Sequence, residues 1–204
     1  MAIILTMNTP IAEQILACAA PMPEGASLTA KVLLHLGNRA AIDQALSRLA
    51  RQGKLLRTGR GLYVRPAESR FGIRAPAPEK VVSELAKARG ETVASHGAAA
   101  ANRLGLTTQI PMRTIYLTSG RTRHLKLGAQ DIELRHAPSW QLTNAGRPSG
   151  DVLRALVWAG RPEAHTTLAR LKEKLAPEVR AELVASRAAL PEWLAETISA
   201  ELAA

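Results

Sequence analysis

The sequence predicts an α+β protein: a small helical domain with a basic hairpin, then a mixed α/β domain with a small antiparallel sheet and trailing helices. Three observations lead to this expectation. Leucine and alanine recur at helical spacing in the first and last parts of the chain, apolar and polar residues alternate between residues 113 and 137, and aromatic residues make up only 3% of the chain. A length of 204 residues fits one large domain or two small ones.

Three helices are expected before the first strand. In the first, Thr9 fits an N-cap and Pro10 fits the first helical position, and the proline-rich residues 21–23 end the helix. A short second helix is expected from about residue 29 to 37 and a third from residue 38 to 53, each closed by a glycine.

The next segment predicts a short hairpin. Residues 54–59 and 61–64 are expected to form two strands, and the glycines of "RTGRG" permit a tight turn between them. Three helices followed by a basic two-stranded hairpin are typical of a winged helix-turn-helix domain, which we assign to residues 1–66.

A second domain is expected after a linker. Residues 67–77 are rich in proline, glycine and arginine with little periodicity, which indicates a linker, and residues 78–160 are assigned to an α/β domain. This domain begins with a helix near residues 78–89 and continues with a short alanine-rich helix that Ser95 can cap and Gly105 can end. Three strands follow, whose alternating apolar residues are Ile115, Leu117, Leu125, Leu127, Ile132 and Leu134.

Residues 161–204 are expected to form a C-terminal helical extension. Leucine and alanine recur there at helical spacing, and Pro162, Pro177 and Pro191 each mark the start of a helix. Acidic and basic residues are nearly balanced from residue 151 onward, whereas the excess that gives the net charge of +10 lies in residues 1–150. A strongly basic surface is typical of proteins that bind nucleic acid.

The third predicted helix has two contrasting faces. At 100° per residue, Ile42, Leu46 and Leu49 share one face, and the opposite face is small, polar and cationic. Arginine can bridge guanine edges and glutamine can bridge adenine, while small residues let the helix approach the bases. An ordinary solvent-exposed helix face is the alternative interpretation. The candidate DNA-binding residues are Asn38, Arg39, Gln44, Ser47, Arg48 and Arg51 on this helix, with Lys54, Arg57 and Arg60 for the phosphates.

Other residues have side chains that could support binding or catalysis. A possible secondary basic patch at Arg121, Arg123, His124 and Lys126 could touch DNA phosphates or an acidic or RNA-bound partner, or only keep the protein soluble. Asp131 and Glu133 suggest a metal-dependent nuclease, but their alternation with apolar residues is better explained by a half-exposed strand. The histidines lack the spacing of metal ligands, and no phosphate-binding loop is present. We therefore expect no metal, no cofactor and no enzymatic activity.

Three segments taken in order resemble one known family. The stretches "GNRAAIDQALSRLARQGKLLRTGRGLY", "SHGAAAANRLGLTTQIP" and "YLTSGRTRHLKLGAQDIELRHA" are similar to the AbiEi-type antitoxins of bacterial type IV abortive-infection toxin–antitoxin systems. The resemblance implies a DNA-binding antitoxin that binds double-stranded DNA at repeats in its own promoter, represses its operon and counteracts a nucleotidyltransferase-like toxin without a stable complex. The alternative is a winged-helix transcriptional regulator whose C-terminal domain serves ligand sensing or dimerisation.

The sequence also bears on the compartment. No apolar run reaches the roughly 18 residues of a membrane span, and the first ten residues lack the basic start of a signal peptide. The single cysteine, Cys18, excludes an intramolecular disulfide and suits a reducing environment. We expect a cytoplasmic protein with no membrane partner.

Overall fold

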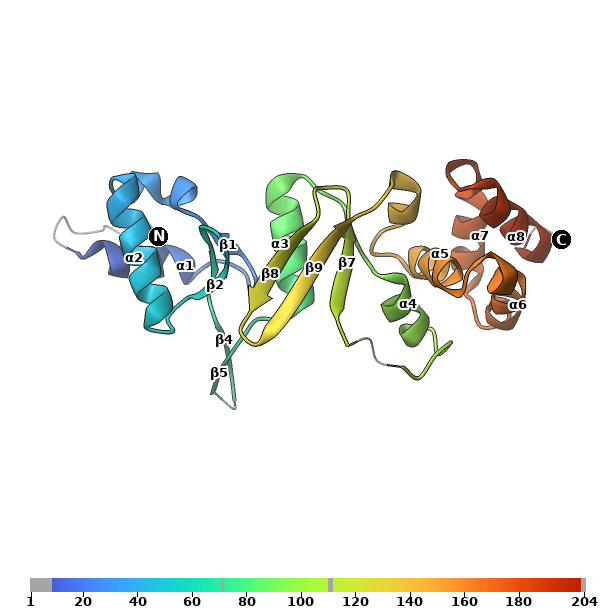
Figure 1. Ribbon diagram of the computed structural model, residues 1–204, viewed down its shortest axis with the longest axis horizontal. Helices are drawn as coiled ribbons and strands as arrows, with labels where there is room; N and C mark the ends of the chain where they lie inside the picture. The colour runs from blue at the N-terminus through green and yellow to red at the C-terminus, as the bar shows by residue number, and fades with distance from the viewer. Residues whose placement is uncertain (1–8, 71, 110–111, 203–204) are drawn as a thin grey trace. The chain divides into compact units, whose positions relative to one another are not determined.

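The computed structural model describes residues 9–70, 72–109 and 112–202 and shows an α+β protein (Figure 1). The predicted absence of a signal peptide concerns residues 1–8, which lie outside the described residues. Contacts divide the chain into two compact units, the first from Met1–Gly90 with His124–Ile132 and the second from Glu91–Arg123 with Glu133–Ala204. The predicted domain limits (1–66, 67–77, 78–160 and 161–204) stay a prediction.

Three helical elements open the first unit. They are α1 (Ile11–Ala19), a 3-10 helix η1 (Ala30–Leu36) and α2 (Arg39–Arg51). The prediction for α1 was wrong by one residue, because Pro10 occupies the cap position and no side chain caps the helix. The carbonyl of Thr9 instead accepts a hydrogen bond from the Gln14 side chain at 2.6 Å.

A three-stranded antiparallel sheet completes this part of the first unit. Its strands are β1 (Ser27–Leu28), β2 (Leu56–Gly59) and β3 (Leu62–Val64), in the order β1-β3-β2. The sequence pattern predicts β2 and β3 but not β1. Buried side chains from the three helices and from β1 and β3 form one core, which includes Ile15, Leu28, Leu33, Ile42, Leu46, Leu49 and Tyr63.

The segment predicted as a linker contains structure. It forms a hairpin of β4 (Ala67–Ser69) and β5 (Gly72–Arg74), in which the Ser69 hydroxyl donates to the Gly72 carbonyl at 2.9 Å. The predicted helix follows as α3 (Pro78–Arg89), and Gly90 ends it with a φ of +64°. Short-range hydrogen bonds therefore order a stretch that has no hydrophobic periodicity.

The predicted strand region is confirmed. A four-stranded sheet has the order β6-β7-β9-β8, with β6 (Val93–Ser95) antiparallel to β7 (Thr114–Thr118). The remaining strands are β8 (Arg123–Leu127) and β9 (Gln130–His136). Leu117, Leu125, Leu127, Ile132 and Leu134 are buried, as the alternation predicted, whereas Ile115 is only half-buried.

The cap of the short alanine-rich helix differs from the prediction. In α4 (Gly97–Arg103) the ring Nδ1 of His96 accepts a hydrogen bond from the Ala98 amide at 3.3 Å. The Ser95 hydroxyl points elsewhere and donates to Asp151 at 2.8 Å. As a cap, the Ser95 oxygen would accept from a backbone amide of the first turn, whereas here the hydroxyl donates a charge-assisted hydrogen bond to a carboxylate.

The elements that follow β9 along the chain are all helical. They are η2 (Ser139–Leu142), α5 (Pro148–Ala159), α6 (Arg161–Lys172), α7 (Pro177–Ala185), η3 (Arg187–Ala189) and α8 (Glu192–Leu202). The three proline-marked helix starts are confirmed. Leucines of α5, α6, α7 and α8 form one core, and no helix within the described residues is both long and apolar enough to cross a membrane.

Candidate nucleic-acid interface

Helix α2 begins at a well-defined cap. The Oδ1 atom of Asn38 accepts a hydrogen bond from the Ala41 amide at 2.9 Å, which satisfies one of the free donors of the first turn. Gly37 precedes the cap, and η1 ends there. Asn38 was predicted as a DNA-binding residue, and its carbonyl oxygen is already used by the helix. The amide nitrogen of its side chain takes no part in the cap and can donate to another partner.

The packing of α2 fixes which residues face outward. Ile42, Leu46 and Leu49 are at most 1% exposed, so the opposite face cannot be in the core. Gln44, Arg48 and Arg51 are exposed on that opposite face. Together with Asp43 and Ser47 they line a shallow depression of the surface. The predicted core face is confirmed, and with it the outward placement of these side chains.

Besides Asn38 and Arg57, whose Nε donates to the Gly59 carbonyl at 3.4 Å, two more members of the predicted set have side-chain partners within the protein. Arg39 forms an ion pair with Asp43 at 3.1 Å, one helical turn away, while 68% of the Arg39 side chain stays exposed. The Ser47 hydroxyl lies 3.3 Å from the Tyr63 hydroxyl on β3 and is half-buried. Exposed ion pairs of this kind are weak, so Arg39 can exchange its partner, whereas Ser47 is held against the sheet.

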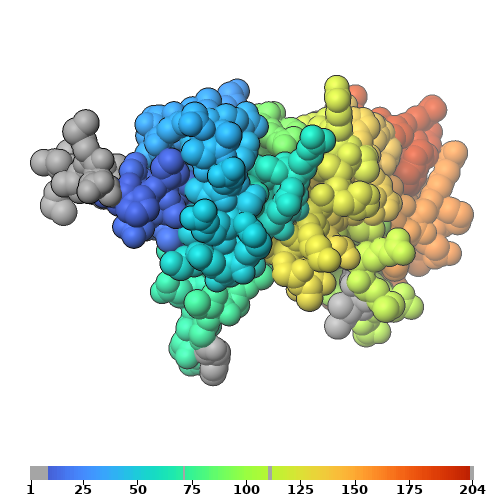
Figure 2. Space-filling model, turned by 60° about the vertical axis from the view of Figure 1, so that its left-hand side comes forward, coloured from blue at the N-terminus to red at the C-terminus, as the bar shows by residue number. Residues whose placement is uncertain are grey.

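The hairpin β2–β3 carries the remaining predicted cations. Lys54, Arg57 and Arg60 are all exposed, and Figure 2 shows α2 and this hairpin, from light blue to cyan, at the surface. The turn is Arg60–Gly61, where Gly61 has a φ of +65° that favours glycine. The buried Thr58 hydroxyl donates to the Leu62 carbonyl at 3.4 Å across the hairpin.

The chemistry of this surface matches that of nucleic acid. Arginine and lysine side chains only donate hydrogen bonds, and the oxygens of phosphate and the guanine major-groove edge only accept them. Asp43 is the one acid between Asn38 and Val64, and it is paired with Arg39. The exposed face of α2 and the hairpin therefore form a nearly pure donor surface. We call this surface, made of Arg39, Gln44, Arg48, Arg51, Lys54, Arg57 and Arg60, the basic face.

One residue of the predicted secondary basic patch, Arg123, has its charge compensated by an ion pair. Arg123 is only 16% exposed and forms an ion pair with Glu91 at 2.5 Å, so its charge is compensated inside the fold. Arg121, His124 and Lys126 are exposed. On β8, His124 and Lys126 alternate with the buried Leu125 and Leu127 as expected for a strand with one wet face.

The residues that suggested a nuclease are engaged differently. Both carboxylate oxygens of Glu133 accept from the Arg135 guanidinium, at 2.8 and 3.1 Å. Asp131 is exposed. Within residues 9–70, 72–109 and 112–202, no three side chains of His, Cys, Asp or Glu gather closely enough to hold a metal ion.

One buried charge, that of Arg154, was not predicted from the sequence. Arg154 lies in the middle of α5 and is only 2% exposed. Its Nη2 atom donates to Asp151 at 3.0 Å. In the sequence, Arg154 is the single arginine of the apolar segment "DVLRALVWA". Most neighbouring residues are apolar, so the helix offers it little solvent-exposed surface.

Comparison with known proteins gives a family but no described activity. No curated protein matches the chain, and no solved structure matches it. A family model does match residues 14–180, which include the whole basic face and most of the second unit. The chain therefore belongs to DUF6088, which is described as a family of unknown function.

Proposed function

We propose that the protein is a sequence-specific DNA-binding protein whose residues 1–66 act as a winged helix-turn-helix. The observation that carries the proposal is the basic face, in which α2 presents Gln44, Arg48 and Arg51 outward while its apolar side is fully buried. In this proposal α2 is the recognition helix in the major groove, and Lys54, Arg57 and Arg60 contact the phosphates. The proposed compartment is the cytoplasm.

The proposed biological role follows the resemblance to the AbiEi-type antitoxins. The protein would repress its own operon and counteract a nucleotidyltransferase-like toxin without forming a stable complex with it. The second candidate is a winged-helix regulator whose C-terminal part senses a ligand or makes dimers. Co-expression distinguishes them: an antitoxin restores growth to cells that express the neighbouring nucleotidyltransferase-like gene, and a plain regulator does not.

The DNA-binding proposal is tested by a gel-shift titration. The full chain is titrated on its own upstream DNA and on a scrambled duplex at two salt concentrations. We expect selective binding, because bidentate contacts to bases discriminate by about 1–3 kcal/mol for each correct pair. Equal and strongly salt-sensitive binding to both duplexes would contradict the proposal, since phosphate contacts alone give that behaviour.

Two substitutions separate base contacts from phosphate contacts. Arg48→Ala should weaken binding to the upstream DNA by about 1–3 kcal/mol and relax the sequence preference. Arg57→Ala should weaken binding to both duplexes alike and reduce the slope of log K against log salt by about 1. Arg89→Ala, which removes an exposed arginine at the end of α3, is the matched control and should change neither. Unchanged affinity in both test variants would refute the assignment of α2 and the hairpin.

A further inference from the structure

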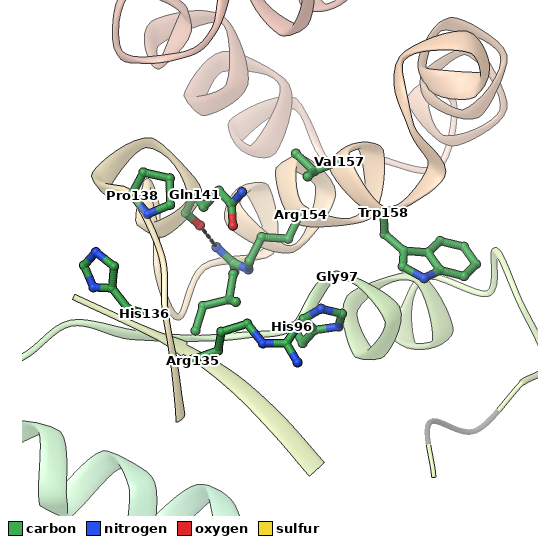
Figure 3. Close-up of a pocket in the computed structure, with 10 residues that line it drawn as sticks. His96, Gly97, Arg135, His136, Pro138, Gln141, Arg154, Val157 and Trp158 are labelled. Carbon is green, nitrogen blue, oxygen red and sulfur yellow. Dashed lines mark hydrogen bonds between the residues drawn. The ribbon is translucent and has the colours of Figure 1, made fainter. Parts of the chain in front are cut away.

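The second unit contains a cavity of about 370 Å³ that the basic face does not use (Figure 3). Strands β7 and β9, η2, the start of α4 and the last turns of α5 supply its walls. Its volume lies within the range of natural small-molecule sites, roughly 300–1,000 Å³. A cavity of this size with several polar side chains on its walls is a candidate binding site.

The charged side chains on the cavity walls are of one sign. Arg135 and Arg154 line it, with His96 and His136, and the described lining residues include no carboxylate. Glu133 compensates the charge of Arg135, but Asp151 is shared between Arg154 and Arg103, so one positive charge remains in excess beside the cavity. The walls therefore favour an anionic ligand.

Arg154 is the buried part of this cationic wall. Its Nη1 atom lies 3.4 Å from the carbonyl oxygens of Gln141 and Thr143, which is long for a hydrogen bond. Its Nε is buried and has no hydrogen-bond partner among the described residues. Burial lowers the pKa of Arg154, although Asp151 opposes this. Asp151 is shared with Arg103 at 2.9 Å, so the charge of Arg154 is only partly compensated.

Arg135 and His96 supply donors on the opposite wall. Arg135 uses Nε and Nη2 for Glu133, which leaves Nη1 for another acceptor. Burial lowers the pKa of His96, and the charge of Arg135 lowers it further while Glu133 raises it. A neutral His96 whose Nδ1 accepts from the Ala98 amide carries its proton on Nε2 and donates there. Figure 3 shows the two side chains next to each other.

The remaining wall is apolar and includes an open aromatic ring. Leu117 and Val157 line the cavity, and Trp158 is 43% exposed at one end of it. In Figure 3 Trp158 lies at the end away from Pro138 and His136, with His96 and Arg135 between. An exposed indole at the end of a cavity with cationic walls suits a flat ring that carries a negative group, because rings stack on tryptophan.

We propose that this cavity binds a small anion with a flat aromatic ring, of the class of the nucleoside monophosphates. Arg135 and the Nε2 proton of His96 hold the phosphate, the partly compensated charge of Arg154 attracts it, and the base stacks on Trp158. The site goes beyond the proposed function, since neither DNA binding by α2 nor the antitoxin role requires it.

Isothermal titration calorimetry on the full chain tests the proposal. The titrants are UMP, AMP, uridine and inorganic phosphate. We expect at least one nucleotide to bind at least tenfold more tightly than both uridine and phosphate, because only a nucleotide uses both the cationic and the aromatic parts. Arg135→Gln and Trp158→Ala should each weaken that binding by about tenfold or more. Both residues are exposed, so circular dichroism should show an intact fold.

A matched control removes the effect of net charge. Arg170→Gln takes the same charge from an exposed position on α6 that does not line the cavity, and it should leave the affinity unchanged. Three results would overturn the proposal. They are no binding of either nucleotide at about 1 mM, phosphate binding as tightly as the nucleotides, or an equal loss of affinity in Arg170→Gln and Arg135→Gln.

Discussion

Replacing Gly97 with alanine tests how closely α4 packs on α5. A Cβ atom on Gly97 would lie 2.5 Å from the carbonyl oxygen of Arg154 and 2.8 Å from the Cβ of Trp158. Neither of these atoms can swing away, because one belongs to the α5 backbone and the other is attached directly to it. The two helices must therefore move apart, which loosens the fully buried contact between Ala100 and Ala155.

Two effects of opposite sign determine the result. Alanine is a better helix former than glycine by up to about 1 kcal/mol, and Gly97 is not among the glycines with a positive φ that alanine would strain. Overpacking costs typically about 1–3 kcal/mol, and occasionally more. Because neither clashing atom can move without the α5 backbone, we place the cost at the upper end. The expected net loss in the free energy of unfolding is about 2 kcal/mol.

Urea denaturation followed by tryptophan fluorescence measures this loss. The three tryptophans are Trp140, Trp158 and Trp193, so the signal reports the second unit alone. With a slope of about 2 kcal/mol per molar urea, the midpoint should fall by about 1 M. Ala99→Gly, at a half-buried position of the same helix, measures the helix-propensity effect without a clash and should cost about 1 kcal/mol. A midpoint that rises in Gly97→Ala would refute the close packing.

Two further predictions concern the first unit. Asn38→Ala should lower its free energy of unfolding by about 1 kcal/mol through loss of the α2 cap, whereas Asn38→Asp keeps the cap; thermal denaturation followed by far-ultraviolet circular dichroism compares them. The pKa of Glu24 is lowered, first by the hydrogen bond from Lys80 and then by that from the Ala77 amide. Since the folded-state pKa lies below the ordinary 4.5, this carboxylate stabilises the fold above pH 4.5, and the effect is lost as the pH falls through the lowered value. Glu24→Gln should therefore be less stable than the native chain at pH 7 and equally stable at pH 2; equal stability at both would exclude the contribution.

Predictions from the sequence were correct where the residue pattern of one helix or strand alone determines which of its side chains are buried. The apolar stripe of α2 identified Ile42, Leu46 and Leu49 as core, and a helix with one buried face must expose the other. The same logic gave the alternating strands and the three proline-marked helix starts. Each of these predictions needed only the period of a single segment, so the basic face followed without knowledge of the rest of the chain.

The predictions were wrong or incomplete where a side chain or strand pairs with a segment that is distant in the sequence. Ser95 has the chemistry of a helix cap, yet it donates to Asp151 instead. The residues predicted as a linker form a hairpin, which is stabilised by backbone pairing between Ala67 and Arg74. Such pairing produces no hydrophobic pattern in the sequence. Strand β1 is two residues long and exists only because β3 is beside it.

Asp151 shows why the cavity could not be found in the same way. Its Oδ1 atom accepts from Ser95 at 2.8 Å, Arg103 at 2.9 Å and Arg154 at 3.0 Å, so one carboxylate joins β6, α4 and α5. Burial raises its pKa, but these hydrogen bonds and the two arginine charges outweigh burial and lower it. With one carboxylate for two guanidinium groups, a buried cation remains beside the cavity. An excess of charge that arises from contacts between distant segments has no period in the sequence, and the net charge of +10 could not locate it.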